Sequence, residues 1–250
     1  MDLPTFERIN RTERSARAYL LQEHSPPACP RCACGTVYRL ASGRLRCASC
    51  RYTFHALTGR WLNQGAFSCQ QWLRAVKLFE LDVTAGLAAT QLGVTYKTAH
   101  RAFTTIRHAI AAAGGVRSRA WAPGSILGYR AEGAGTVLRL VSSAELKRIT
   151  AASLVGAAAG PVALTGPFLQ WQGLIVQRRD ARIWGVRINP HGAAGGGGFR
   201  EYVAERVRRY RGISARHLPL YLLEMEFRFN AKGSDLFEAI AASLRLSVST

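Results

Sequence analysis

Two Cys-x-x-Cys pairs constrain this chain more than any other feature. The first pair is Cys29 and Cys32, the second is Cys47 and Cys50, and residues 33–46 lie between them. Each pair fits a tight turn that aims two thiolates at one point, and the intervening residues can form a hairpin that brings the turns together. The spacing predicts a zinc ribbon in which these four cysteines bind a structural zinc ion.

Two further cysteines and two other chemistries compete with this interpretation. Cys34 lies just past the first pair, and Cys69 falls in an expected helix, where a single thiol usually behaves as a small buried hydrophobe. Two disulfides would need an oxidising compartment, but residues 1–15 are polar and charged and lack the apolar core of a signal peptide. Because these residues do not form a signal peptide, we expect a cytoplasmic protein. Four thiolates also leave no open coordination position at the zinc ion, so a catalytic zinc is not expected.

The balance of charge indicates a polyanionic partner. Over 250 residues the chain has 34 Lys+Arg against 15 Asp+Glu, a formal net charge of +19. Such a surface attracts nucleic acid. The preference for Arg suits phosphate and guanine contacts, and it equally suits a GC-rich genome. A membrane is disfavoured, because the longest apolar run, 151–164, is broken by Gly and Pro and is too short to span a bilayer. We expect double-stranded DNA as the partner, while a homo-oligomer stays open.

Short elements are expected around the cysteines. Apolar spacing permits a helix over 6–22, and the ribbon should contain strands over 36–40 and 51–54 with a turn at 41–43. Basic residues crowd this module: Arg31, Arg39, Arg44, Arg46 and Arg51. A solvated face explains any one of them, but together they favour phosphate contact, with Arg44, Arg46 and Arg51 as our candidates.

A pattern of caps, helices and a glycine turn follows the ribbon. Ser68 is a plausible N-cap for a helix through 72–79, and Thr84 for a second helix over 85–92. Gly93 permits a tight turn before a new cap at Thr95, and Leu87, Leu92 and Val94 should lie between the two helices. This order predicts a helix-turn-helix.

The recognition helix of such a motif would begin near residue 96. The residues expected at DNA are Tyr96, Lys97, Thr98, His100 and Arg101 toward a major groove, with Arg107 further along toward the backbone. A helical hairpin without DNA contact is the alternative.

The remaining residues predict a mixed α/β domain beyond a linker at 116–124. Strands are expected over 126–130, 136–141, 161–164, 173–176 and 183–188, with a helix over 142–152 among them. A glycine-rich loop at 191–198 precedes helices over 199–211, 215–229 and 235–244. We expect three domains: 1–62 with the first helix and the ribbon, 66–115 with the helix-turn-helix, and 124–250 with the sheet and last helices.

This order of pieces resembles the insertion-sequence transposases that carry a zinc ribbon, a helix-turn-helix and an ISXO-like DDE domain. Three stretches carry the likeness. The first runs from Cys29-Pro30-Arg31-Cys32 through Phe54 and Thr58-Gly59, and the second is Leu92 to Ala99. The third runs from Tyr210 to Ser214 and on through Leu218, Tyr221-Leu222, Glu224 and Phe227 to Asn230. The resemblance implies DNA transposition, recognition of terminal-repeat DNA, and a reduced ribonuclease H-like domain. In that fold three carboxylates hold two divalent ions for attack on a DNA phosphate.

The chain departs from the family pattern at the catalytic acids. Glu132 is the only acid where the first Asp belongs, and the second and third acids fall on Gly166 and Gly197. A substitute set of Glu132, Asp180 and Glu201 can be drawn, but Asp180 lies in an arginine-rich turn where a solvated role is the simpler interpretation. The resemblance thus implies a transposase-family DNA-binding protein with strand-transfer activity weakened or lost, and Mg²⁺ is expected only if activity persists.

Two other functions stay open. One is an active Mg²⁺-dependent DDE-type transposase that uses Glu132, and the other is a zinc-ribbon transcriptional regulator or RNA-binding protein without catalysis. Ordinary hydrolase chemistry has little support, because no Gly-x-Ser-x-Gly elbow is present.

Overall fold

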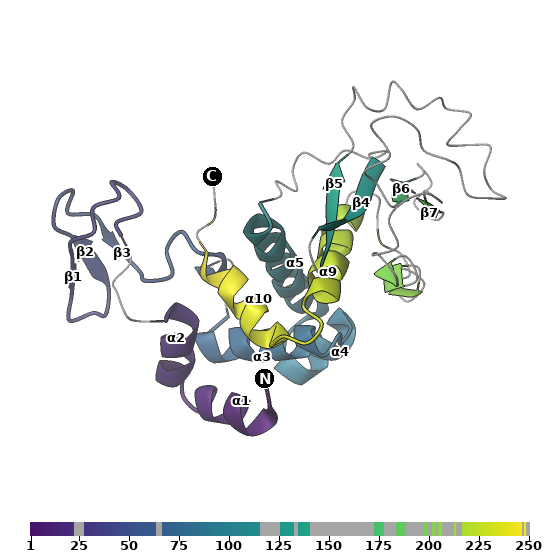
Figure 1. Cartoon of the computed structure of the whole chain (residues 1–250). Helices are drawn as coiled ribbons and strands as arrows, with labels where there is room; N and C mark the ends of the chain where they lie inside the picture. Colours follow the sequence, from purple (N-terminus) through teal and green to yellow (C-terminus); the bar gives the residue numbers. More distant parts are fainter. Residues whose placement is uncertain are drawn as a thin grey trace. The chain divides into compact units, whose positions relative to one another are not determined.

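A computed structural model describes most of the chain outside the central region. The described residues are 1–22, 28–63, 67–115, 126–132, 135–140, 173–177, 184–188, 198–199, 202–203, 205–206, 213, 217–246 and 248. The chain forms two compact units, Met1–Val116 with Gly233–Thr250, and Arg117–Lys232 (Figure 1). Helices and an antiparallel sheet occur together in the second unit, so the fold is mixed α/β, as predicted.

The last helix belongs to the first unit. α10 (Leu236–Arg245) packs on α3 (Cys69–Glu80) and α5 (Tyr96–Ala113). Its apolar face is completely buried there, with Phe237, Ile240 and Leu244 each at 0% exposure. The predicted domain 124–250 differs from the structure at this end, because that apolar face is covered by helices from the start of the chain.

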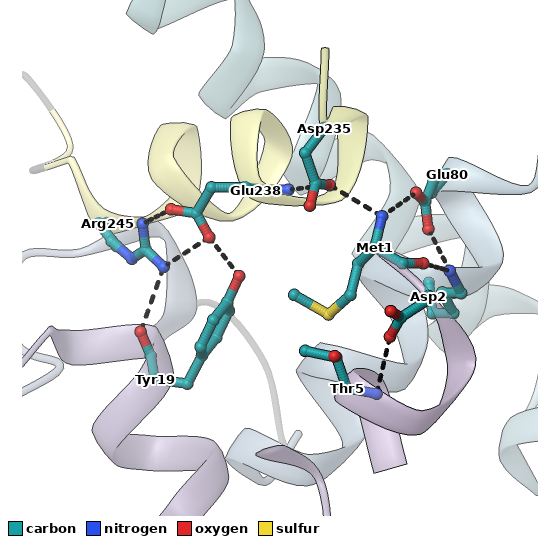
Figure 2. A network of polar contacts seen from close by, with 9 residues as sticks. Met1, Asp2, Thr5, Tyr19, Glu80, Asp235, Glu238 and Arg245 are labelled. Carbon is teal, nitrogen blue, oxygen red and sulfur yellow. Dashed lines mark hydrogen bonds and ion pairs between the residues drawn. The ribbon is translucent and has the colours of Figure 1, made fainter. Parts of the chain in front are cut away.

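A polar network links α10 to the N-terminal helices (Figure 2). The Tyr19 hydroxyl donates to Glu238 Oε2, and the Arg245 guanidinium binds the other oxygen of Glu238 and also donates to the Tyr19 carbonyl at 3.2 Å. Burial opposes ionisation of Glu238, but Arg245 and Tyr19 together lower the pKa of its carboxyl. On the same helix, Asp235 accepts the Met1 amine at 3.0 Å, and that amine lies 3.4 Å from Glu80.

Two helices replace the single helix expected over 6–22. They are α1 (Leu3–Ile9) and α2 (Glu13–Leu21). Thr12 caps α2 in a reciprocal arrangement with Ser15: each side-chain oxygen accepts the other residue's backbone N–H, both at 3.1 Å. These local bonds give the backbone an alternative to continuing the first helix, so the chain breaks there.

A small antiparallel sheet carries the cysteine pairs. It consists of β1 (Val37–Arg39), β2 (Leu45–Cys47) and β3 (Thr53–Phe54), in that order. The turn expected at 41–43 is confirmed. Its Gly43 has a φ of 75°, a left-handed conformation that glycine adopts without strain. The predicted strands are confirmed, with shorter bounds.

Three capped helices follow η1 (Trp61–Asn63): α3, α4 (Ala85–Leu92) and α5. Ser68, Thr84 and Thr95 are their N-caps, and each accepts the backbone N–H three residues further on, as the sequence predicted. Gly93 ends α4 with a φ of 64°. None of the helices in the described ranges is long and apolar enough to span a membrane.

Aromatic side chains fill the core between these helices. Trp72 is 1% exposed, and its indole N–H donates to the Leu62 carbonyl at 3.0 Å. Phe79 and Phe103 meet edge to face, with centroids 5.2 Å apart. Leu87 does not lie between the helices as expected, because α4 buries its other face and leaves Leu87 52% exposed.

The second unit contains a four-stranded sheet and α9 (Leu218–Asn230). The strands are β4 (Ile126–Glu132), β5 (Gly135–Leu140), β6 (Gly173–Gln177) and β7 (Trp184–Ile188), in the order β5-β4-β6-β7 with every pairing antiparallel. Four predicted strands are confirmed to within two residues. The linker at 116–124, the helix at 142–152, the strand at 161–164 and nearly all of the glycine loop lie outside the described residues.

Side chains of α9 cover the edge of this sheet. Asn230 accepts the backbone N–H of Thr136 at 2.8 Å and donates to the carbonyl of the same residue at 2.7 Å. One helical turn earlier, Glu226 accepts the N–H of Leu138 at 3.0 Å. A Cβ on Gly135 would lie 3.1 Å from Asn230 Oδ1. The absence of a side chain at Gly135 therefore leaves space for the side-chain amide of Asn230. Three outward backbone groups of β5 are thereby paired within the unit, which protects part of an edge that could template aggregation.

We predict that Asn230→Ala destabilises the second unit. Thr136 is 2% exposed, so the variant leaves a buried N–H and a buried carbonyl unpaired. Such losses cost about 1–3 kcal/mol. Urea unfolding should show a lower midpoint than for the control Asn63→Ala, which removes an exposed amide. Equal midpoints for the two variants would contradict the edge-covering role.

A second prediction concerns the N-terminus of α3, which Glu13 of α2 caps. Glu13 accepts the N–H of Cys69 at 2.7 Å and of Gln70 at 3.0 Å. Burial raises the pKa of this carboxyl, but the two N–H groups outweigh burial and hold it below its ordinary value of 4.5. The stabilisation is therefore complete above that value and is lost as pH falls through the folded-state pKa.

Glu13→Gln should accordingly lower the free energy of unfolding by about 0.5–1 kcal/mol at pH 7, since Glu13 is partly exposed to solvent. Urea titrations of both proteins from pH 7 down to about pH 3 should show this difference constant above pH 4.5 and shrinking below it. Glu7→Gln, an exposed change on α1, is the matched control. A difference between Glu13→Gln and wild type that is independent of pH would contradict the capping role.

Candidate metal centre

The four predicted ligands converge on one point. The Sγ atoms of Cys29, Cys32, Cys47 and Cys50 all lie within 4.8 Å of one another. Cys29 Sγ is 3.6 Å from Cys50 Sγ, and Cys32 Sγ is 3.5 Å from Cys47 Sγ. With Zn–S bonds of about 2.3 Å, sulfurs at the corners of a tetrahedron are about 3.8 Å apart, whereas a disulfide needs about 2.05 Å. The four thiols are free and fit a tetrahedral ion.

Both cysteine turns have the same backbone geometry. The N–H of Cys29 donates to the Cys34 carbonyl at 2.9 Å, and the N–H of Cys47 donates to the Tyr52 carbonyl at 3.0 Å. The residue after the second cysteine of each pair is left-handed, with φ of 58° at Ala33 and 57° at Arg51. That conformation costs a non-glycine residue about 1–2 kcal/mol. Its occurrence at the same place in both turns indicates that the thiol geometry compensates the strain.

The ribbon sheet has one buried face and one solvent face. Leu45, Cys47 and Phe54 are 3%, 1% and 2% exposed, and Leu45 lies opposite Phe54 in the strand register. Because side chains alternate along a strand, Arg46 lies on the other face, where it is exposed. The sheet therefore holds Cys47 against the core and presents its other face to solvent.

The thiols influence one another's ionisation. The backbone N–H of Cys50 lowers the pKa of Cys47 to about 6. The backbone N–H of Cys34 acts in the same direction on Cys32, but the neighbouring thiols of Cys50 and Cys47 outweigh it and raise the pKa of Cys32 to about 12. Like charges this close disfavour one another. A divalent cation stabilises four thiolates together, which is the chemistry that zinc supplies.

The remaining cysteines stay out of the cluster. Cys34 Sγ lies 3.8 Å from the Thr36 carbonyl. Cys69 is 4% exposed at the start of α3, and burial raises the pKa of its thiol to about 12. In the ranges described, no second group of three or more His, Cys, Asp or Glu side chains comes within ligating distance.

The candidate catalytic acid lies at the end of a strand. Glu132 is the last residue of β4, and its Cα pairs with that of Gly135 on β5. Asp180, Glu201 and the two glycine positions at 166 and 197 lie outside the described residues. A carboxylate site for Mg²⁺ therefore stays a prediction.

Most of the residues expected at DNA lie at the surface. On the ribbon, Arg44, Arg46 and Arg51 are exposed. On the first turns of α5, Lys97 and Arg101 are exposed and Tyr96 is 61% exposed, while Thr98 and His100 are half-buried. The opposite face of these turns is buried and consists of Ala99, Ala102 and Phe103. The rings of Tyr96 and His100 lie 5.8 Å apart.

Arg107 does not have the expected position. It is 6% exposed, and its guanidinium carbon lies 5.3 Å from the centroid of the Phe79 ring. Arg107 follows Phe103 by four residues, so the helical period places it on the buried face of α5. We therefore exclude Arg107 from the candidate DNA contacts.

The distribution of acids adds a signal that composition alone did not reveal. No Asp or Glu occurs between Glu23 and Glu80, nor between Asp82 and Glu132. The first interval contains the whole ribbon, and the second contains all of α4 and α5. Both candidate DNA-contacting elements thus lack internal acids that would neutralise their arginines and lysines.

We predict that Cys47→Ser loses the metal and unfolds the ribbon, because ligation supplies much of the folding free energy of such modules. Zinc content of the purified protein should be about one ion per chain for wild type and for the control Cys34→Ser, and well below that for Cys47→Ser. Undiminished zinc in Cys47→Ser would contradict the ligand assignment.

Comparison with known proteins adds no relative. No family model, curated protein or solved structure matches this chain. The likeness to insertion-sequence transposases therefore depends on the sequence stretches quoted above, and the functional argument depends on the residues of this chain.

Proposed function

We propose that this chain is a DNA-binding protein of the insertion-sequence transposase type, with strand-transfer activity weakened or lost. In this proposal α4 and α5 form a helix-turn-helix that recognises terminal-repeat DNA. The zinc ribbon adds contacts to the phosphate backbone through its arginines.

The observation that carries the proposal is the division of α5 into two faces. Ala99 and Phe103 are 0% and 2% exposed, so one face is fixed against the core of the unit. The opposite face begins with exposed Lys97 and Arg101, immediately after a capped turn. A helix whose N-terminal turns offer long donors from a rigid support suits the major groove.

Charge on the ribbon supports the same function. Arg44, Arg46 and Arg51 are exposed on a module that contains no acid. Arginine binds phosphate through two donors in a fixed geometry. Such contacts position a protein on DNA without reading its sequence, so they complement base contacts from α5.

Use of the carboxylates supports the loss of catalysis. Glu13 caps α3, Glu226 caps the edge of β5, and Glu238 binds Arg245. Glu224 is 1% exposed and accepts the guanidinium of Arg228 at 2.7 Å. In the described part of the chain these four acids have structural partners within their own units, so they are not available to hold two divalent ions.

We predict that Arg101→Ala weakens binding to DNA from the ends flanking its own coding region more than binding to random DNA. Loss of a base contact costs about 1–3 kcal/mol of discrimination. Fluorescence anisotropy at two salt concentrations measures both affinities. Arg11→Ala, an exposed arginine outside the ribbon and α5, is the control with the same change in charge. An equal loss on both DNAs would reduce Arg101 to a backbone contact.

The same DNA tests for catalysis. Incubation of wild-type protein with Mg²⁺ should give salt-sensitive binding and no nicks. Metal-dependent nicks that Glu132→Ala abolishes would instead establish the active transposase.

A further inference from the structure

The solvent face of the ribbon sheet combines an aromatic ring with a cation. Tyr38 on β1 lies directly opposite Arg46 on β2, and Arg46 lies opposite Thr53 on β3. Residues that are directly opposite share one face of a sheet. Tyr38, Arg46 and Thr53 therefore form a row across all three strands, which we term the outer row.

The outer row sets a solvent-exposed aromatic ring beside an exposed cation. Tyr38 is 59% exposed, and Arg46 beside it is also exposed. Tyr52, the other ribbon tyrosine, is 38% exposed, and its ring stacks on that of Phe54 with centroids 6.0 Å apart and an interplanar angle of 10°. The Tyr38 ring is thus the more exposed of the two, and it lies on the strand face that also carries Arg46.

We infer that the outer row binds an unpaired DNA strand. A base stacks on Tyr38, a phosphate accepts from the Arg46 guanidinium, and Thr53 offers a hydroxyl at the third strand. The inference rests on the proposed DNA-binding function and extends it: the outer row binds an unpaired strand, next to the duplex that α5 and the other ribbon arginines, Arg44 and Arg51, bind.

Stacking favours the unpaired strand over the duplex. In a duplex both faces of each base are covered by neighbours, so a ring on a flat sheet finds no base to stack on. A single strand exposes those faces, and proteins bind it with aromatic rings set among basic residues on sheet surfaces. The absence of acids between Glu23 and Glu80 keeps phosphate repulsion low at this face.

The test compares two tyrosines on two DNAs. Full-length zinc-loaded protein is titrated by anisotropy with a labelled single-stranded oligothymidine and with a duplex from the flanking DNA, and a uridine oligomer serves as the RNA probe. Tyr38→Ala should weaken single-strand binding about tenfold or more, with duplex binding changed less than about twofold. Tyr38→Phe keeps the ring and should bind the single strand like wild type. Tyr96→Ala, an exposed tyrosine on α5, should show the opposite selectivity.

Each outcome decides the inference. Unchanged single-strand affinity in Tyr38→Ala, with zinc content and the circular dichroism spectrum retained, would overturn it, as would an equal loss on single strand and duplex. Binding of the uridine oligomer tenfold tighter than oligothymidine would overturn it in favour of RNA. If the wild-type protein binds the duplex but not the single strand, this inference is contradicted and the proposed function is not. If it binds neither DNA, both the inference and the proposed function are contradicted.

Discussion

The convergence of four cysteine thiols on one point is the constraint on which the ribbon depends. Cys32 and Cys47 sit 3.5 Å apart between Sγ atoms, and two residues adopt left-handed backbone conformations to bring the pairs together. Ionising four thiols this close together is unfavourable by itself, and so is the backbone strain. A divalent ion at the centre would compensate both, and it would fix the three strands, which are too short to be stable alone. The outward position of Tyr38 and Arg46 follows from the strand register, so the same small sheet that brings the cysteines together also sets the charged surface.

Features set by neighbours in sequence were predictable. The cysteine spacing identified all four members of the cluster, and Ser68, Thr84 and Thr95 were found as caps because a cap bonds to a backbone group three residues away. The break at Thr12 depends on the same short-range chemistry. It was missed because the apolar pattern of 6–22 fits one helix, while the reciprocal partner of Thr12 is Ser15 rather than the more familiar Glu or Gln.

Features set by distant contacts were not predictable. An apolar stripe such as that of α10 shows that a partner exists, but not which one, so the helix was placed with the sheet that precedes it in sequence. Arg107 illustrates the same limit. Its charge suggested a surface position, whereas the packing of α5 against α3 puts its guanidinium beside Phe79. The two backbone bonds of Asn230 likewise depend on the β5 edge, which lies far from it in sequence.

Binding and catalysis make opposite demands on this sequence. A surface for DNA needs arginines that no neighbouring acid neutralises, and the acid-free intervals around the ribbon and α5 provide it. A two-metal site needs several carboxylates close enough to repel one another, held in place by the ions. In the part of the chain that the structure describes, several acids instead make folding contacts: Glu13 binds two backbone N–H groups, and Glu224 binds Arg228. Carboxylates held in this way stabilise their own units. Under the proposed function, the same scarcity of acids that favours DNA binding disfavours strand transfer.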